Sequence, residues 1–161
     1  MTTTVLQPRV GDHVGQPYRA KDITMAATID VANRTVFLTG AIDTNNHDIL
    51  VRVELPESGV WHVIKSETNL TDQTWNAWQI TLGEGTTIVP EPENHTNICQ
   101  QYRRLHIAES RERFCFFDGE IRPGEPILKQ FTLNTQIPRI VMAHNRSVPT
   151  IVGESDLTEV P

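Results

Sequence analysis

A two-residue alternation of side chains between positions 49 and 55 is the feature that most restricts the folds open to this chain. In ILVRVEL, β-branched residues and leucine occupy every second position, and Arg52 and Glu54 lie between them. This pattern is typical of a β-strand with one buried face. Pro56 and Gly59 follow and favour a turn. The segment therefore predicts a strand that ends at a turn, after which a second strand runs back.

Short segments of the same kind fill most of the chain. No window of 11 or more residues has a convincing helical period. We therefore predict an all-β domain over residues 23–143, a single antiparallel β-sandwich or barrel of about 8–10 short strands. The expected strands and the hairpin are ITMAATID (23–30), RTVFLTG (34–40), ILVRVEL (49–55), VWHVIKS (60–66), TWNAWQITLG (74–83), TTIVP (86–90), NICQQYRRLHIAESRERFCFFDG (97–119), PILKQFTL (126–133) and PRIVMA (138–143).

The two terminal segments, residues 1–22 and 144–161, have scattered proline and glycine and no period, so we interpret them as extended arms. Extended arms can add strands to an exposed sheet edge of a neighbouring copy, or wrap their own domain. The first reading predicts self-association, with arginines of the 97–119 hairpin contacting acidic groups of another copy. The residues expected to carry assembly are Val5, Leu6, Val10, Val14, Arg103, Arg111, Ile151, Val152 and Leu157.

The charge balance restricts the partners. The 161 residues carry a formal charge of −6, which disfavours nucleic acid or an anionic membrane as the main partner. No apolar run reaches the length of a transmembrane helix, and the first residues lack the basic start and apolar block of a signal peptide. We therefore expect a cytoplasmic protein or a virus particle component assembled in the cytoplasm, with copies of itself or other structural proteins as partners.

Cys99 and Cys115 are expected to be free, partly buried thiols. If the hairpin turn lies near residues 109–111, Cys99 faces about residue 121 and Cys115 about residue 105, so the two are not opposite each other. Another register would change this prediction.

All three tryptophans lie between residues 61 and 78. Trp78 shares a face with Ile80 and Leu82 and is expected in the core, whereas Trp61 fits a core or an interface equally well. Trp75 alternates with polar residues, so it is either exposed or covered by a loop. If it is exposed, the region predicts a carbohydrate or small-ligand site. The residues of that hypothesis are Trp75, Asn76, Asp72 and Trp61.

No pattern in the sequence indicates a catalytic, metal or cofactor site. The six histidines form no close ligand pair, and no nucleophile elbow or phosphate-binding loop is present. DGEIRPGEP (118–126) is similar to the second cupin motif, but Leu128, Lys129 and Gln130 stand where its histidine should follow. GVW (59–61) is similar to the lipocalin Gly-x-Trp motif, which belongs near the start of a barrel, and 58 residues precede it here.

These observations favour a non-enzymatic structural protein that assembles with itself through its arms, such as a virus or phage capsid, decoration or tail component. We expect no cofactor. Two alternatives stay open. The first is the small-ligand or carbohydrate-binding domain around Trp75. The second is a cupin-like or lipocalin-like enzyme or carrier with an internal pocket lined by His62, Tyr102 and His106.

Overall fold

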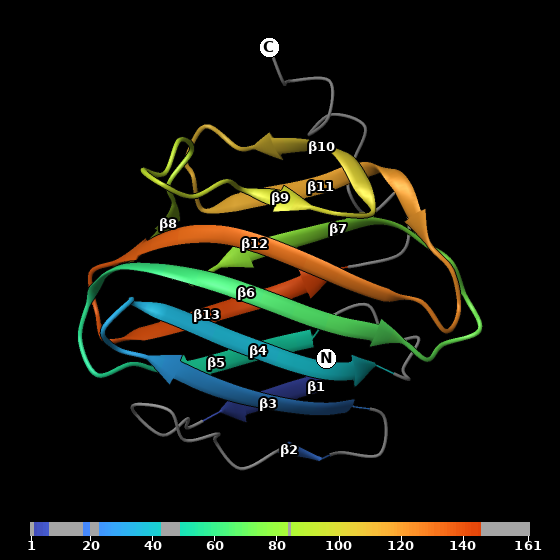
Figure 1. Cartoon of the computed structure of the whole chain (residues 1–161), viewed down its shortest axis with the longest axis horizontal. Helices are drawn as coiled ribbons and strands as arrows, with labels where there is room; N and C mark the ends of the chain where they lie inside the picture. The colour runs from blue at the N-terminus through green and yellow to red at the C-terminus, as the bar shows by residue number, and fades with distance from the viewer. Residues whose placement is uncertain (1, 7–17, 20–22, 43–48, 84, 146–161) are drawn as a thin grey trace.

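Thirteen β-strands form a single sheet in the computed structural model, which describes residues 2–6, 18–19, 23–42, 49–83 and 85–145. This part of the chain contains strands, turns and loops but no helix (Figure 1). The strands are β1 (Thr2–Leu6), β2 (Tyr18–Arg19), β3 (Ile23–Asp30), β4 (Thr35–Ile42), β5 (Ile49–Glu54), β6 (Gly59–Asn69), β7 (Trp75–Leu82), β8 (Thr86–Ile88), β9 (Ile98–Cys99), β10 (Tyr102–Ile107), β11 (Arg113–Ile121), β12 (Pro126–Thr135) and β13 (Arg139–Asn145).

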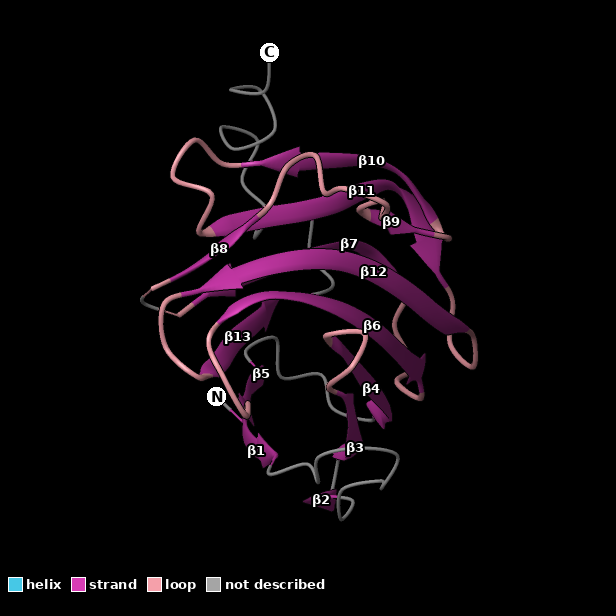
Figure 2. Cartoon of the chain, turned by 60° about the vertical axis from the view of Figure 1, so that its left-hand side comes forward, coloured by secondary structure: helices cyan, strands magenta, loops and turns pink. Residues whose placement is uncertain are grey.

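The sheet curls into a nearly closed barrel, so the all-β prediction is confirmed (Figure 2). Around the barrel the strands follow the order β1-β5-β13-β7-β11-β10-β9-β12-β6-β4-β3-β2, and β8 pairs with β12 beside this path. Most neighbours are antiparallel. The pairs β1–β5 and β4–β6 are parallel. A parallel pair requires a crossover connection between its two strands. Between β4 and β6 the chain makes this crossover through β5, which lies in a different part of the barrel.

The structure has more strands than predicted because some are very short and others lie in the N-terminal segment. β1 and β2 lie in the segment interpreted as the N-terminal arm. β9 is a two-residue strand that joins β10 to β12. Strands of two residues are below the length that side-chain alternation can reveal.

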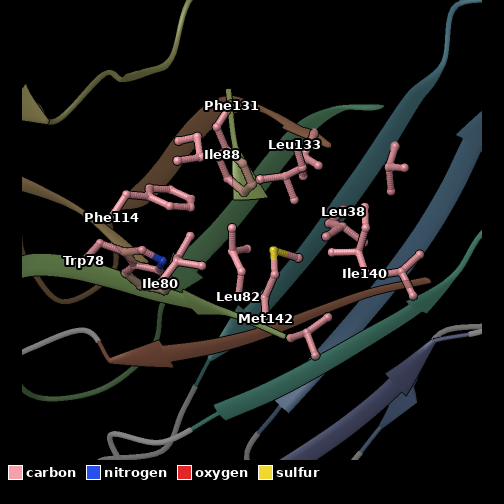
Figure 3. Packing of buried hydrophobic residues seen from close by; sticks show 14 of the residues in the cluster. Leu38, Trp78, Ile80, Leu82, Ile88, Phe114, Phe131, Leu133, Ile140 and Met142 are labelled. Atoms are coloured by element: carbon pink, nitrogen blue, oxygen red, sulfur yellow. The ribbon is translucent and has the colours of Figure 1, made fainter. Parts of the chain in front are cut away.

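Apolar side chains from strands β3 to β13 meet in one interior core (Figure 3). Trp78, Phe114 and Phe131 are among its largest fully buried members. Each fully buried aromatic or branched aliphatic side chain stabilises the fold by about 1.5–3 kcal/mol relative to exposure. A second, smaller cluster holds Ala77 and Cys115 with Phe117 packed against them.

The 97–119 segment forms the expected hairpin, with β10 antiparallel to β11. Cys115 faces His106, one residue from the predicted position. The predicted partner of Cys99, about residue 121, is wrong, because β9 pairs with β10 and β12 and places Cys99 opposite Tyr102 and Lys129. Both thiols are free, as predicted, and both are buried. The turn runs from Ala108 to Arg113, whose backbone groups are hydrogen-bonded to each other.

A β-bulge interrupts β11 between Phe117 and Ile121. Asp118 has a positive φ of 65°, and Gly119 lies against the backbone of Gln101. A Cβ atom at position 119 would be 1.9 Å from the Gln101 carbonyl oxygen, which explains the glycine. A bulge bends its strand and increases the local twist.

No helix among the described residues has the length and apolar character needed to cross a membrane.

Candidate functional site

The inner faces of β6 and β12 combine apolar and charged residues. In β6 every second side chain points inward. These residues are Trp61, Val63, Lys65, Glu67 and Asn69, and all of them are buried. In β12 the inward position between Ile127 and Phe131 is Lys129, which is also buried. The strand period of two therefore places two lysines and one glutamate inside the barrel.

The pairing of the strands brings these side chains together. Lys65 and Lys129 face each other across the antiparallel β6–β12 ladder, and Glu67 faces Ile127. On its other side, Lys129 is paired with Cys99 of β9. Like charges directly opposite each other are unfavourable in a sheet. Glu67, two residues along β6, offsets this repulsion.

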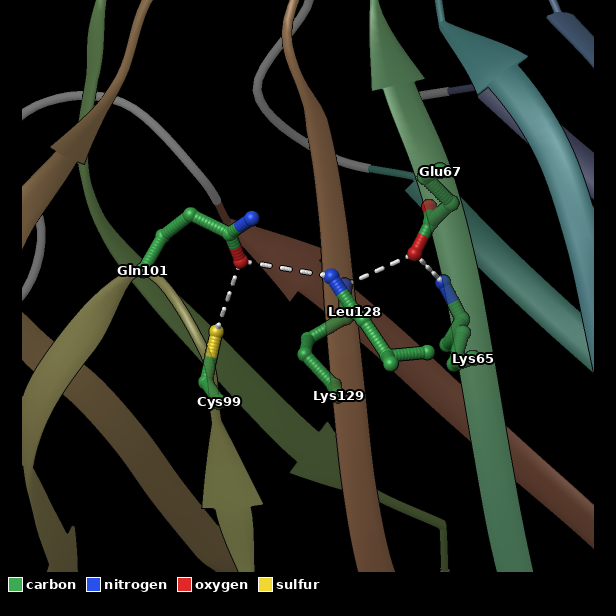
Figure 4. A network of polar contacts seen from close by, with 6 residues as sticks. All are labelled: Lys65, Glu67, Cys99, Gln101, Leu128 and Lys129. Atoms are coloured by element: carbon green, nitrogen blue, oxygen red, sulfur yellow. Dashed lines mark hydrogen bonds and ion pairs between the residues drawn. The ribbon is translucent and has the colours of Figure 1, made fainter.

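Lys65, Glu67 and Lys129 form what we call the lysine–glutamate cluster (Figure 4). Nζ of Lys129 donates a hydrogen bond of 2.7 Å to Oε1 of Glu67, and Nζ of Lys65 donates to the same oxygen. Gln101 lies beside the cluster, where its Oε1 accepts from the backbone N–H of Leu128 and from the Cys99 thiol.

Trp78 of β7 reaches the cluster from another wall of the barrel. Nζ of Lys129 is 3.2 Å from the centroid of its ring, and Nζ of Lys65 is 5.4 Å from it. An aromatic face attracts a cation, and the attraction is largest where water is excluded. The ring therefore lies where it can stabilise positive charge on Lys129.

Burial controls the protonation of the cluster. Lys65 and Lys129 are each 0% exposed and Glu67 is 1% exposed. Burial lowers the pKa of Lys129 well below its ordinary value, Glu67 opposes the shift, and Lys65 adds to it. Lys129 therefore loses its proton more readily than an exposed lysine does. Burial also raises the pKa of the Cys99 thiol, against the effect of Lys129, so Cys99 adds no negative charge.

The cluster is unlike the ion pairs on the surface. Arg122 pairs with Glu120, and Arg52 and Arg139 pair with Glu54, where the side chains are partly exposed and such contacts contribute about 1 kcal/mol or less. Burying two amines and a carboxylate costs several kcal/mol for each ion. Buried, perturbed titratable groups of this kind are concentrated at functional sites.

A separate cleft lies on the outer side of the barrel, where the loop after β8 approaches β6 and β12. Its volume is about 370 Å³. The rings of His62 and His95 are stacked with centroids 3.3 Å apart, and Nδ1 of His62 lies 2.9 Å from Oγ1 of Thr132. Asn97 fixes the loop, because its amide donates to the Val89 carbonyl. The lining residues are Val60, His62, Val89, Pro92, Glu93, Asn94, His95 and Thr132.

The stacked histidines predict a pH-dependent stability. Burial lowers the pKa of His62 below its ordinary value of 6.5, and the nearby His95 and Arg34 add to this shift. The unfolded chain therefore binds a proton at His62 before the folded chain does, so stability falls as pH drops below 6.5. We expect the urea midpoint to decrease modestly between about pH 7 and about pH 5.5.

The matched variant for this prediction is His62→Gln, which has no titratable group at position 62. Its urea midpoint should depend less on pH over the same range than that of the unmodified chain. An equal pH dependence in the two proteins would show that His62 is not the group responsible.

The structure corrects the expectation for Trp75. Its side chain is 1% exposed and packs against Trp78, with ring centroids 5.2 Å apart. Trp75 begins β7 opposite Ile121, next to the bulge in β11. Asn76 and Asp72 are exposed. The three residues therefore do not form one exposed platform.

Trp61 also lies in the core rather than on the surface. It is fully buried, and its Nε1 donates to the Glu57 carbonyl at 3.1 Å. The guanidinium of Arg34 lies 4.4 Å from its ring centroid. Trp78 is buried in the core as predicted.

The structure does not bring together the three residues expected to line an internal pocket. His62 lines the outer cleft. Tyr102 is buried, and its hydroxyl donates to the Trp75 carbonyl at 2.7 Å. His106 is buried on β10 opposite Cys115.

The residues expected to carry assembly are only partly described. Val5 and Leu6 belong to β1, whose backbone pairs with β5 of the same chain. Arg103 and Arg111 are exposed on the hairpin. Val10, Val14, Ile151, Val152 and Leu157 lie outside the described residues. Self-association through the arms stays a prediction.

Sequence reasoning missed the lysine–glutamate cluster, although two signals for it were present. Lys65 and Glu67 share the parity of Trp61 and Val63, and Lys129 shares that of Ile127. The chain also has only three lysines, Lys21, Lys65 and Lys129, against 11 arginines. Two of the three thus fall on inward positions of strands.

In the part of the chain that the structure describes, no three His, Cys, Asp or Glu side chains are grouped to hold a metal ion. No curated protein and no solved structure matches the sequence. A family model does match, over residues 25–160, which includes the barrel strands from Met25 onward and both strands that carry the lysine–glutamate cluster. The chain therefore belongs to the family of unknown function DUF6423.

Proposed function

We propose that this protein binds a small molecule inside its barrel, with the lysine–glutamate cluster as the recognition site. The observation that carries the proposal is the complete burial of Lys65 and Lys129 around one carboxylate oxygen of Glu67. Two amines beside a single carboxylate are an unfavourable arrangement for stability alone. They are suited to a ligand that brings a further oxygen acceptor.

The chemistry of the cluster selects the class of ligand. An amine is a hydrogen-bond donor, and an ammonium group is a donor only. A carbonyl or carboxylate group of a ligand matches these donors. The apolar walls around the cluster, with Trp75, Trp78 and Ile127, favour an apolar remainder on the ligand. We therefore propose a small, largely apolar oxo compound or carboxylic acid.

This proposal develops the internal-pocket alternative and moves its polar groups to different residues. Assembly through the arms is a separate proposal, and the solution mass measured by light scattering tests it. The pairing of β1 with β5 of the same chain favours the alternative in which the N-terminal segment folds onto its own domain.

Tryptophan fluorescence provides the test, because Trp75 and Trp78 lie in the barrel core and Trp78 contacts the cluster. The full chain is titrated with butanal and, separately, with butyrate. We expect a saturable change in emission with at least one probe, and loss of that change in Lys65→Met/Lys129→Met. The matched control is Arg104→Met, which removes an exposed cation from β10 and should bind as the unmodified chain does.

A response that survives in the double lysine variant would place binding elsewhere, such as the outer cleft. The absence of a saturable response to both probes would overturn the proposal.

A further inference from the structure

We propose that Lys129 forms a covalent imine with the carbonyl group of an aldehyde or ketone bound in the barrel. The inference rests on the proposed function and makes it more specific, because it replaces simple hydrogen bonding with a reversible covalent bond. It stands on the arrangement of Lys129, Lys65, Glu67 and Trp78 around one buried position.

Lys129 is the better placed of the two amines. Its Nζ lies 2.7 Å from Oε1 of Glu67 and 3.2 Å from the centroid of the Trp78 ring, whereas Nζ of Lys65 lies 5.4 Å from that centroid. A lysine becomes nucleophilic when burial or a neighbouring cation favours its neutral form. Both conditions hold for Lys129, since it is fully buried and faces Lys65 across the ladder.

The surrounding groups fit each stage of the condensation. The Lys129 nitrogen adds its electron pair to the carbonyl carbon, and the carbonyl π pair moves to oxygen. Glu67 accepts a proton from the nitrogen, and the Lys65 ammonium supplies one to the oxygen. Glu67 then returns its proton to the carbinolamine hydroxyl, which leaves as water while the nitrogen electron pair forms the C=N bond, so the product is the protonated imine and Glu67 is a carboxylate again. One amine and one carbonyl compound give one imine and one water, with no change in oxidation state.

The protonated imine carries a positive charge that the site is built to hold. The Trp78 ring lies over the nitrogen and attracts a cation through its π face. Glu67 supplies the negative charge on the other side. Because Lys65 has given up a proton in the condensation, the positive charge of the cluster moves from Lys65 to the imine nitrogen, where Glu67 and the Trp78 ring both contact it.

The use of lysine agrees with this role. Apart from Lys21, the other cationic residues of the chain are 11 arginines, among them the surface partners of Glu54 and Glu120. An arginine stays protonated in proteins and does not serve as an amine nucleophile. For ion pairing alone, arginine is the residue more often used in buried positions.

Reductive trapping tests the proposal on the full chain. The folded protein is incubated near neutral pH with butanal and sodium cyanoborohydride, which reduces an imine to a stable butyl amine, and the modified lysine is located by peptide mass spectrometry. We expect butyl-Lys129 to exceed butyl-Lys65 and butyl-Lys21 by at least about tenfold, the preference that one pKa unit would give. In urea-unfolded protein the three lysines should react alike, and butyrate should give no adduct.

Two variants separate the possible failures. Lys129→Met should lose the preferred adduct, and Arg104→Met should keep it. Labelling of Lys21 or Lys65 alone, or no labelling, would overturn the imine. If emission still responds to butanal in that case, the proposed binding function stands without the covalent step. If emission does not respond either, both proposals fail.

Discussion

Glu67→Gln is expected to destabilise the folded protein by about 3–5 kcal/mol, because it removes the carboxylate with which the buried Lys65 and Lys129 both pair. Glutamine has nearly the same shape as glutamate, so packing changes little. The loss is therefore electrostatic. Urea unfolding followed by far-UV circular dichroism measures it, with the slope of the transition unchanged if the barrel stays compact.

The control for this variant is Glu57→Gln, at a carboxylate that pairs with Arg34 on the surface and is 58% exposed. Removing an exposed partner should change stability by about 1 kcal/mol or less. If the two glutamine variants lose similar, small amounts, Glu67 is not the counter-charge on which the buried amines depend.

Replacing the whole lysine–glutamate cluster with apolar residues is not expected to destabilise the protein, in contrast to Glu67→Gln. Lys65→Met/Glu67→Leu/Lys129→Met should leave stability unchanged or raise it by about 1–4 kcal/mol, since the desolvation cost of all three groups disappears together. The same urea measurement applies. The triple variant should also lose the fluorescence response to butanal and butyrate.

A triple variant several kcal/mol less stable than the unmodified chain would contradict this expectation and show that the cluster holds the barrel together. A stable variant that no longer binds would separate stability from function at these positions, which single substitutions do not achieve because each leaves partners behind.

The sequence predicts the barrel well where side-chain alternation is strong. Val51 and Val53 of β5 and the inward residues of β12 are buried as the two-residue period indicates. The parallel pairing of β4 with β6 could not be predicted from the sequence, because it depends on β5 pairing in another part of the sheet. No local pattern encodes such a crossover.

Trp75 shows why one site prediction was wrong. Its neighbours Gln79 and Thr81 implied the polar face of β7, but the alternation does not hold over the whole strand, since Ala77 and Trp78 are both buried. The pairing of β7 with β11 also shifts register between Phe117 and Ile121, about forty residues away in the sequence, and no local pattern in β7 indicates such a shift. The lysine–glutamate cluster is difficult to predict for a different reason, because lysine is almost never fully buried unless it is paired, and the sequence does not show which residue lies opposite it.

The ladder between β6 and β12 also bears on how the protein is made. It joins residues 59–69 to residues 126–135, and the order of strands around the barrel mixes early and late segments. Folds dominated by such distant pairings form slowly, because the closure entropy of long loops comes before the contacts that offset it. Lys65 and Glu67 leave the ribosome well before Lys129 does. The lysine–glutamate cluster therefore forms only late in synthesis. An incomplete chain that ends before β12 has Lys65 and Glu67 but lacks Lys129 and the strand that pairs with β6.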